Sequence, residues 1–457
     1  MKIDLPEKVN MIIRTLNDAG FEAYAVGGCI RDSILGRTPS DWDITTSANP
    51  QEVKLLFRRT IDTGIRHGTV TVMLDKDSFE VTTYRIDGEY EDGRHPKDVV
   101  FTKSLYEDLR RRDFTINAMA YNEQCGLVDA FGGIKDLENQ MIRAVGNPKE
   151  RFTEDALRIM RSVRFAAQLG FSIEQGTRDA AKYLAGNLRK ISAERIQTEL
   201  VKLMVSDHPE FLKTAYEIGI TKETLPEFDC CMETEQNHPH HCYTVGEHIL
   251  KALQHVKAGD MQDEKKLKFI RLALLFHDSG KPRTKTTDDK GIDHFHGHAA
   301  VSEEIAGTAL RRLHFDNETT GIVKLLVKYH DYKPQACPAG VRRAVNRVGE
   351  EIFPLLLSVM EADIYAQSKY QREEKLSYLS QIRKIYETIL RERDCLSIKD
   401  LAITGKDLIE AGIPSGPRIG SALKHILSIV LEEPSCNTKE YLSDYVKQNI
   451  SALLTLE

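Results

Sequence analysis

Two aspartates separated by one residue, Asp41 and Asp43, constrain this chain more than any other feature. We predict an extended strand over residues 42–45, and residues i and i+2 of a strand point to the same side. Both carboxylates can therefore reach one space. Two hard oxygen ligands at this spacing suit Mg²⁺, which proteins usually hold through one or two carboxylates together with substrate phosphates.

A glycine turn and an arginine precede the aspartate pair. Gly27 and Gly28 follow a short apolar run, and glycines there let the backbone approach a ligand closely. Arg31 follows as a fixed positive charge. Glycine turns and Asp-x-Asp pairs also occur separately on solvated loops. Their combination favours a site that binds a nucleoside triphosphate through a metal ion.

Length and composition limit the classes of protein open to this chain. Its 457 residues predict two to four domains, because a chain of this length is too long for a single hydrophobic core. The net charge of -6 excludes a polycation that binds nucleic acid over its whole surface, so any such surface must be local. We expect no membrane partner, because there is no apolar run of bilayer length and no signal-peptide core. The eight cysteines form no CxxC pair and, with the missing signal, predict reduced thiols and a cytoplasmic location.

Two β-branched segments follow the aspartate pair. Residues 69–74 and 79–84 predict two paired strands. Glu80 lies in the second strand and is either a third carboxylate of the site or an ordinary exposed strand residue. Residues 87–98 are polar and rich in turn formers, and the length of this segment favours a functional loop.

Three consecutive arginines, residues 110–112, lead into an apolar stretch. We predict a helix here, on which Asp113 and Asn117 share a face because they lie four residues apart. Charge runs usually form a solvated face. Three adjacent cations beside a buried helix nevertheless favour at least one arginine that faces an anion.

After Pro148 the pattern becomes entirely helical, and Thr153 is a natural N-cap for the helix that follows. Charged residues then recur every three positions, which places them along one side of that helix. These residues are Asp155, Arg158, Arg161 and Arg164. A solvated i,i+3 salt bridge is the alternative for the first two, and we favour a functional role because the helix follows the domain with the aspartate pair.

Four sequence motifs, in this order, resemble one known family: GGCIRD, DWD, RRDFTINAMA and EDALRIMRSVRF. The family is that of the class II tRNA nucleotidyltransferases and poly(A) polymerases, and the resemblance covers residues 20–230. Residues 235–370 resemble an HD-type phosphohydrolase domain less specifically. Residues 401–423 are similar to the C-terminal helical body of bacterial CCA-adding enzymes.

The resemblance implies an α+β fold. A polymerase-β-like nucleotidyltransferase head, a mixed sheet with helices, would be followed by all-α domains that include an HD-type helical domain. The implied domains are a catalytic head, a nucleotide-selecting and RNA-binding neck, an HD-type metal-binding domain and a tRNA-binding tail. Their expected boundaries are 1–148, 149–232, 233–370 and 371–457.

The family's roles at the phosphates carry over to matching residues. Asp41 and Asp43 would hold two Mg²⁺ ions that clamp the triphosphate and activate the 3′-hydroxyl of the RNA. Gly28 would let the backbone touch the phosphates, Arg31 would pair with them, and Arg112 would help to hold the nucleotide.

The resemblance places base selection on the helical segment. Asp155 and Arg158 would read the base edge, while Arg161 and Arg164 would support the base and phosphates. The chemistry agrees, since an ionised aspartate only accepts hydrogen bonds and an arginine only donates them. Cytosine and adenine both present an amino donor beside a ring-nitrogen acceptor, and uracil and guanine present the opposite pattern.

The expected function is template-independent addition or repair of the 3′-terminal CCA of tRNA, with CTP and ATP as substrates. An A-adding enzyme or poly(A) polymerase on the same scaffold is the alternative within the family. The oligomeric state is left open by the sequence. The alternative from another class of enzyme is an HD-type metal phosphohydrolase that acts on RNA ends.

The HD-type resemblance implies a second metal site. The matching ligands are His248, His277, Asp278 and Asp363, and His298 could join a second metal. Imidazole and carboxylate together suit a divalent transition metal better than magnesium. Water activated there would attack a phosphoester, and a 2′,3′-cyclic phosphate or 3′-phosphate on a damaged tRNA end would fit the neighbouring domains. The alternative is a set of histidines that binds no metal.

Overall fold

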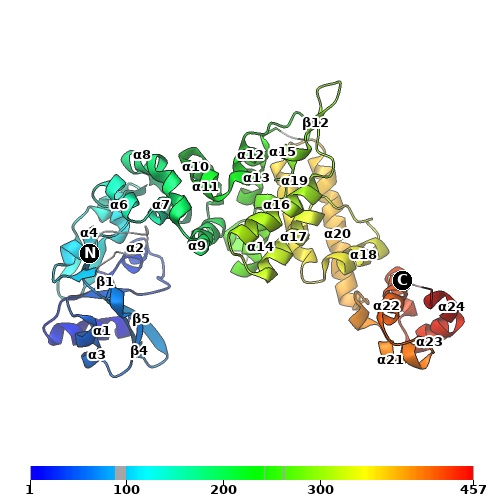
Figure 1. The fold of residues 1–457 in the computed structure, drawn as a ribbon, viewed down its shortest axis with the longest axis horizontal. Coiled ribbons are helices and arrows are strands. Elements are labelled where there is room, and N and C mark those ends of the chain that lie inside the picture. Colours follow the sequence, from blue (N-terminus) through cyan, green and yellow to red (C-terminus); the bar gives the residue numbers. More distant parts are fainter. Residues whose placement is uncertain (1, 88–98, 241, 261–262, 456–457) are drawn as a thin grey trace. The chain divides into compact units, whose positions relative to one another are not determined.

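A computed structural model describes residues 2–87, 99–240, 242–260 and 263–455 (Figure 1). The chain divides into two compact units, residues 1–229 with 312–314, and residues 230–311 with 315–457. The expected division into four domains stays a prediction. The functional loop predicted at 87–98 lies outside the described residues, except for its first residue.

A seven-stranded mixed sheet forms the core of the first unit, with the strand order β3-β4-β5-β2-β1-β8-β9. Only the β2–β5 pair is parallel, and every other neighbouring pair is antiparallel. The strands are β1 (Ala23–Val26), β2 (Ile44–Thr46), β3 (Thr60–Gly64), β4 (Thr69–Leu74), β5 (Asp77–Thr83), β8 (Met119–Asn122) and β9 (Gly126–Asp129). The paired strands predicted at 69–74 and 79–84 are confirmed as β4 and β5.

Helices and a separate ribbon accompany this sheet. The helices are α1 (Glu7–Asp18), α2 (Gly28–Ile34), α3 (Pro50–Leu56), α4 (Leu105–Arg110) and α5 (Gly133–Glu138). β6 (Arg85–Asp87) pairs with β7 (Val99–Phe101), and β10 (Met141–Ile142) pairs with β11 (Ser172–Ile173). The single helix predicted after the arginine run is wrong. A 3₁₀ turn, η2 (Thr115–Asn117), leads into β8, and β8 is buried between β1 and β9, where an apolar run suits a strand.

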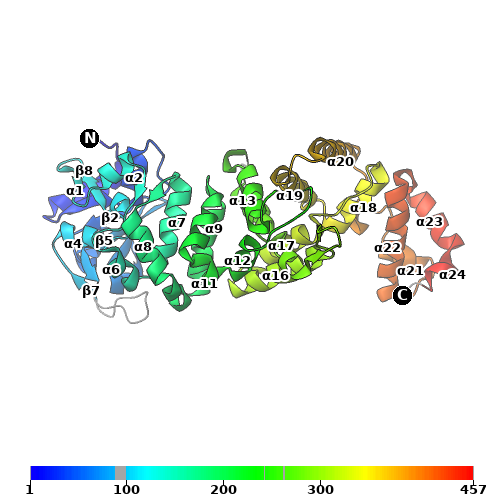
Figure 2. The ribbon, with the colours of Figure 1, turned by 90° about the horizontal axis from the view of Figure 1, so that it is seen from above.

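Short helices follow the sheet and pack against one another (Figure 2). They are α6 (Pro148–Glu154), α7 (Leu157–Leu169), α8 (Gln175–Leu184), α9 (Ala193–Met204), α10 (Leu212–Ile218), α11 (Ile220–Thr224) and α12 (Pro226–Met232). The prediction that Thr153 caps a helix is wrong, because Thr153 lies inside α6. The N-cap of α6 is Asn147, whose side chain accepts from the Lys149 amide.

The second unit is helical apart from the short pair β12 (Thr286–Thr287) and β13 (Asp293–His294). Its first helices surround the histidine-rich segments and are α13 (Val245–His255), α14 (Glu264–Phe276), α15 (Lys281–Thr284), α16 (His298–Arg312), α17 (Asn317–Tyr329), α18 (Pro338–Val348) and α19 (Phe353–Ala366). The others are α20 (Arg372–Glu392), α21 (Gly405–Glu410), α22 (Pro417–Glu432), α23 (Lys439–Gln448) and α24 (Ile450–Leu453). The last four share an apolar cluster of their own. Among the described residues, no helix is long and apolar enough to cross a membrane.

Candidate functional site

Three carboxylates lie near the start of β2, in the middle of the sheet. Asp41 and Asp43 are exposed and immediately precede β2, which begins later than predicted. The Asp43 carbonyl still accepts from the Val26 amide at 3.0 Å, so the backbone stays extended there. Because Ile44 pairs with Val81 in the parallel register, Asp43 lies beside Glu80 on β5.

The surroundings of Asp43 and Glu80 disfavour the charged forms of these two carboxylates. Burial by neighbouring protein atoms raises the pKa of Asp43; Arg112 partly opposes this, and Asp41 adds to it. Burial, followed by the charges of Asp43 and Asp41, likewise raises the pKa of Glu80. A divalent cation would relieve this repulsion, and the register favours Glu80 as a third carboxylate of the group.

Arg112 points toward the glycine turn. Gly27 has a φ of +86°, and a Cβ there would lie 3.2 Å from Arg112 Nη1, so the glycine makes room for the guanidinium. Arg112 Nη2 contacts the buried carboxylate of Asp108 at 3.4 Å. Its Nε is buried and donates no hydrogen bond to any described residue. Arg112 therefore keeps donor capacity for an anion.

A chain of buried polar contacts joins the sheet to the helices that follow. Arg31 donates to the Asn117 side chain at 2.8 Å, and Asn117 donates to Asp113 at 3.3 Å. Asp113 accepts two bonds from Arg161, at 2.6 and 2.8 Å. Burial opposes the ionised form of Asp113, but Arg161 holds its pKa well below the usual range. The ionised carboxylate of Asp113, compensated by Arg161, is therefore the centre of this series of polar contacts.

The same series of polar contacts continues onto α9. Glu199 accepts from Arg164 Nε at 2.8 Å and lies 3.6 Å from Arg161 Nη1. The guanidinium groups of Arg31, Arg161 and Arg164 all lie over the ring of Phe165, at 5.1, 5.3 and 3.5 Å from its centroid. Three of the five predicted arginines thus converge on one aromatic ring.

The residues predicted to read the base lie at a break between two helices. Asp155 ends α6, and α7 begins at Leu157, so the predicted uninterrupted row along one helix is wrong. Asp155 accepts from the Leu157 amide at 3.0 Å and from Arg195 on α9 at 2.7 Å. Asp155 is therefore fixed by the backbone at the start of α7 and by a cation from α9.

Arg158 is buried near the start of α7. It donates to the Arg111 carbonyl and to Glu154 at 2.8 Å each, and to the Arg151 carbonyl at 3.3 Å. These bonds tie α7 to both the arginine run and α6.

Sequence reasoning missed Glu199, Arg195, Asp108 and Phe165. For Glu199 the sequence did contain a signal. Glu199 falls on the apolar stripe of α9 between Ile196 and Leu203, where an acidic residue needs a buried partner. Asp108 is three and four residues before two arginines, the spacing of helical ion pairs. No local signal identifies Arg195 or Phe165.

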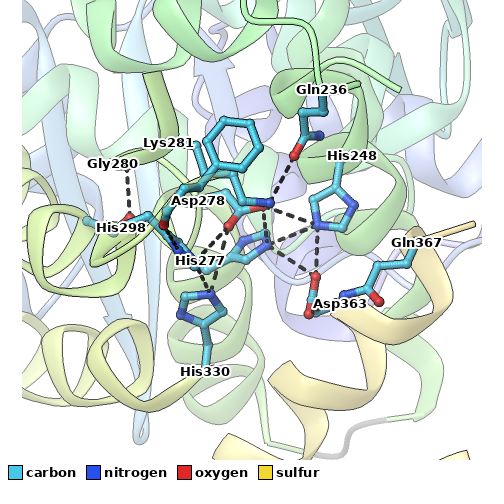
Figure 3. A network of polar contacts seen from close by, with 12 residues as sticks. Gln236, His248, His277, Asp278, Gly280, Lys281, His298, His330, Asp363 and Gln367 are labelled. Carbon is cyan, nitrogen blue, oxygen red and sulfur yellow. Dashed lines mark hydrogen bonds and ion pairs between the residues drawn. The ribbon is translucent and has the colours of Figure 1, made fainter. Parts of the chain in front are cut away.

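A second cluster lies in the other unit, where histidines and aspartates in or next to α13, α14, α16, α17 and α19 come together (Figure 3). Two groups have ligand atoms within 4.8 Å of one another: His248, His277 and Asp363, and Asp278, His298 and His330. All five HD-type residues predicted from the sequence are present. His330 was missed, although it forms a second His-Asp pair with Asp331 directly after a helix, as His277 does with Asp278.

Backbone carbonyls orient three of these rings. The Nδ1 atoms of His277, His298 and His330 each donate to a carbonyl three residues earlier, at 2.8, 2.9 and 2.7 Å. Each ring therefore directs Nε2 toward the cluster, the orientation of a metal-bound imidazole.

Without a metal, the positive and negative charges of the cluster compensate one another. Burial lowers the pKa of His277, but Asp278 and Asp363 raise it to about 10. Burial and the His277 charge lower the pKa of His330 to about 4. Asp278 Oδ2 lies 2.7 Å from Lys281 Nζ but is buried without a hydrogen bond of proper geometry from any described residue. These donors fit a divalent transition metal.

Three family models match this chain. The head domain of poly(A) polymerase matches residues 23–143, and a probable RNA- and SrmB-binding site of polymerase A matches residues 170–232. A putative second domain of tRNA nucleotidyltransferases matches residues 285–446.

Relatives cover the chain to different extents. A CCA-adding enzyme of Leuconostoc mesenteroides is 34% identical over 450 residues, which are 96% of each chain. One of Lactobacillus helveticus is 49% identical over 246 residues, 52% of this chain and 61% of the relative. The crystal structure of the Bacillus stearothermophilus CCA-adding enzyme in complex with CTP superposes with a TM-score of 0.70 at 28% identity, covering 97% of this chain and 96% of that one.

Fold and matches together define a nucleotidyltransferase. Within that class, the chain belongs to the family of CCA-adding enzymes.

The buried Glu199 yields a stability test. Glu199→Ala leaves Arg164 buried without its anion, so we expect the free energy of unfolding of the first unit to fall by about 3–5 kcal/mol. Hydrogen exchange of the full-length protein, read in α7 and α9, measures this loss. The control is Lys202→Ala, an exposed change on the same helix, expected to stay within about 0.5 kcal/mol. Equal protection in the two variants would contradict the role of Glu199.

Proposed function

We propose that this enzyme adds or repairs the 3′-terminal CCA of tRNA from CTP and ATP without a nucleic-acid template. The observation that supports this most directly is the placement of Asp41, Asp43 and Glu80 close together at the central strands β2 and β5, with Arg112 nearby. Two Mg²⁺ ions held by Asp41 and Asp43 would supply the positive charge that nucleotidyl transfer needs. Family membership and the CTP complex of the Bacillus relative agree with this substrate class.

The chain's own residues would hold the nucleotide. Arg112 would bind the phosphates through its guanidinium group, whose Nε donates to no described residue, and the turn at Gly28 would let its backbone approach them. Arg31 and Arg164 are paired and buried, and the half-buried Arg161 is paired with Asp113, so these three arginines would supply fixed positive charge to the site. Such preorganised charge stabilises a transferring phosphoryl group without reorganisation during the reaction.

Asp155 and Arg158 would select the base. Their present bonds use only part of their capacity, since a carboxylate accepts about four hydrogen bonds and a guanidinium donates five. Being fixed at the start of α7, they can present one acceptor and one donor to the base edge. A-only or poly(A) addition on the same scaffold remains the alternative.

We further propose that the histidine cluster binds a divalent transition metal and hydrolyses phosphoesters. His248, His277, Asp278 and Asp363 would hold the metal, and the His248–His277 Nε2 distance of 3.2 Å favours this. Two nitrogens bound tetrahedrally to one metal at about 2.05 Å lie about 3.3 Å apart. This activity would serve an RNA end bearing a 2′,3′-cyclic phosphate or 3′-phosphate.

Stepwise addition tests the first proposal. tRNA ending at the discriminator base, at C or at CC is incubated with CTP and ATP separately, and products are resolved on sequencing gels. We expect CTP to extend the first two and ATP to extend the third. Extension of only the CC-ended tRNA by ATP, or long A tails on generic RNA, would support the alternative.

Removal of the Asp43 charge should abolish both additions. Asp43→Asn is expected to slow CMP and AMP incorporation by at least about a thousandfold, because metal-held charge contributes several kcal/mol. Single-turnover incorporation measures this. Asp75→Asn, a change in an exposed turn ion pair with Lys8, is the control and should keep normal rates. Similar rates for both variants would exclude Asp43 from the reaction centre.

Arg158 should affect base choice more than affinity. Arg158→Lys keeps the charge but loses the planar fork, so we expect the preference for CTP over UTP in kcat/KM to fall by about 10- to 100-fold. Arg110→Lys is the control, since Arg110 is exposed at the end of α4. If Arg158→Lys raises the KM for both nucleotides equally, the edge-reading role is wrong.

Phosphatase turnover tests the second proposal. Full-length protein loaded with Mn²⁺ or Ni²⁺ should hydrolyse p-nitrophenyl phosphate, and His277→Ala should lose at least about 100-fold in rate, since it removes a ligand. The control is His425→Ala in the tail, where the histidine contacts Tyr445. Absence of turnover by the loaded unaltered protein would overturn this proposal.

A further inference from the structure

Asp108 is a buried carboxylate beside the proposed nucleotide site. It lies on α4 and has no exposed surface, so its charge must be compensated within the protein. Arg111 supplies this compensation, with Nη2 and Nε at 2.8 and 2.9 Å from Asp108 Oδ1. Burial opposes the ionised form of Asp108, but the charges of Arg111 and Arg112 hold its pKa below the usual range. The carboxylate is therefore an anion throughout the neutral pH range.

The second oxygen of Asp108 faces both Arg112 and the strand that follows Asp43. Thr45 Oγ1 donates to Oδ2 at 3.1 Å, and Arg112 Nη2 donates to the same oxygen at 3.4 Å. Thr45 lies on β2, two residues after Asp43. The same hydroxyl lies 3.2 Å from a backbone carbonyl of β5, the strand that carries Glu80. One carboxylate oxygen thus joins Arg112 to the central strands of the sheet.

The distances leave Arg112 oriented but still charged. Arg111 makes the shorter contacts and balances the charge of Asp108, so the longer contact directs Arg112 Nη2 without cancelling its charge. On the other side, a Cβ at Gly27 would lie 3.2 Å from Arg112 Nη1. The charge of Arg112 also reaches Asp43, where it opposes the effect of burial on the pKa. Arg112 is thus held between Asp108 and the glycine turn, close enough to act on Asp43.

Arg111 extends the arrangement to the start of α7. Asp108 Oδ1 binds the Arg111 side chain, and the Arg111 carbonyl accepts from Arg158 Nη2 at 2.8 Å. The two oxygens of Asp108 therefore have separate roles. Oδ1 supports Arg158 through Arg111, and Oδ2 orients Arg112.

We propose that Asp108 is a positioning residue for nucleotidyl transfer, whose Oδ2 holds the Arg112 guanidinium in place for a triphosphate and ties it through Thr45 to the strand after Asp43. The inference rests on the proposed binding of CTP and ATP phosphates by Arg112. An arginine side chain that is already oriented loses less conformational freedom when it binds a phosphate. The alternative is an ion pair that only stabilises α4.

The substitution Asp108→Asn separates the two oxygens. The amide oxygen keeps the two bonds from Arg111, and the amide nitrogen can donate to the Thr45 hydroxyl, which is able to accept. That nitrogen then faces Arg112 Nη2, one donor against another. The variant therefore breaks the contact with Arg112 while the other two partners stay bonded.

A double-mutant cycle for CTP binding tests the proposal. The dissociation constant of CTP is measured by isothermal titration calorimetry for the full-length protein, for Asp108→Asn, for Arg112→Ala and for the double variant. We expect each single change to raise Kd by about 10- to 100-fold, since each weakens a hydrogen bond to a charged group. The double variant should bind no more weakly than Arg112→Ala. If the two effects multiply, Asp108 does not act through Arg112 and the proposal is overturned.

Asp136→Asn is the matched control. Asp136 is also buried in the first unit, and it accepts from Thr115 Oγ1 at 2.6 Å and from Arg143 Nε at 3.2 Å. We expect its effect on the Kd of CTP to multiply with that of Arg112→Ala, because the two side chains share no partner. Non-additivity equal to that of Asp108 would show a general loosening of the unit and contradict a specific contact with Arg112.

Base choice distinguishes positioning from general damage. In Asp108→Asn the contact with Arg111 is kept, so Arg158 keeps its acceptor. The preference for CTP over UTP in kcat/KM should therefore stay within about twofold of normal, while the KM for both nucleotides rises. A fall in this preference as large as that expected for Arg158→Lys would show that the whole segment has moved, and it would overturn the positioning role.

Thr45 gives a second pair of variants, which tests the proposal even if Asp108→Asn does not fold. Thr45→Val keeps the shape of the side chain without its hydroxyl, and we expect the Kd of CTP to rise about threefold to tenfold. Thr45→Ser keeps the hydroxyl and should restore binding. The effect of valine should disappear in the Arg112→Ala background. Normal CTP binding by Thr45→Val would overturn the tie between Arg112 and β2, and circular dichroism checks the folding of each variant.

Addition assays separate this inference from the proposed function beneath it. If the unaltered protein extends tRNA with CTP and ATP but the effects of Asp108→Asn and Arg112→Ala multiply, only the role of Asp108 is overturned. If the unaltered protein binds neither nucleotide and extends no tRNA, the proposed function and this inference are both wrong.

Discussion

A network of alternating charges links the sheet to α7 and α9 in the first unit. Asp113 from the sheet domain binds Arg161, and Glu199 from α9 binds Arg164 while lying near Arg161. A buried guanidinium that loses its carboxylate costs several kcal/mol, so none of these groups can move independently. Arg31, Arg161 and Arg164 are thus fixed over Phe165, and this preorganised charge suits the proposed nucleotide site.

A different constraint shapes the histidine cluster. Three rings are held by carbonyls three residues earlier, two of them at the ends of α14 and α17, so helix ends and not side-chain partners set the direction of Nε2. Helix termini leave carbonyls without intrahelical partners, and a histidine there satisfies one while it keeps a lone pair for a metal. Asp278 lies close to both groups, with Oδ2 3.4 Å from His277 Nε2 and Oδ1 3.5 Å from His298 Nε2.

Sequence patterns gave correct predictions for features that depend only on residues close together in the chain. The aspartate pair, the β4–β5 hairpin and the His277-Asp278 turn follow from short patterns, and the structure has each of them. The pattern of apolar residues after the arginine run wrongly predicted a helix. β8 is buried on both sides, and such a strand lacks the alternation of polar and apolar residues that distinguishes a strand from a helix. The cap at Thr153 failed because Asn147 and Pro148 start α6 earlier.

The sequence by itself determined the candidate site residues of this protein: the Asp41–Asp43 pair, the arginines and most of the histidine cluster, since each depends on residue type and short spacing. Tertiary structure decided their partners. The parallel β2–β5 register puts Glu80 beside Asp43, α9 supplies Glu199 and Arg195, and α17 supplies His330. Those partners come from segments distant in the chain, and only packing, which must pair every buried charge, brings them to the site.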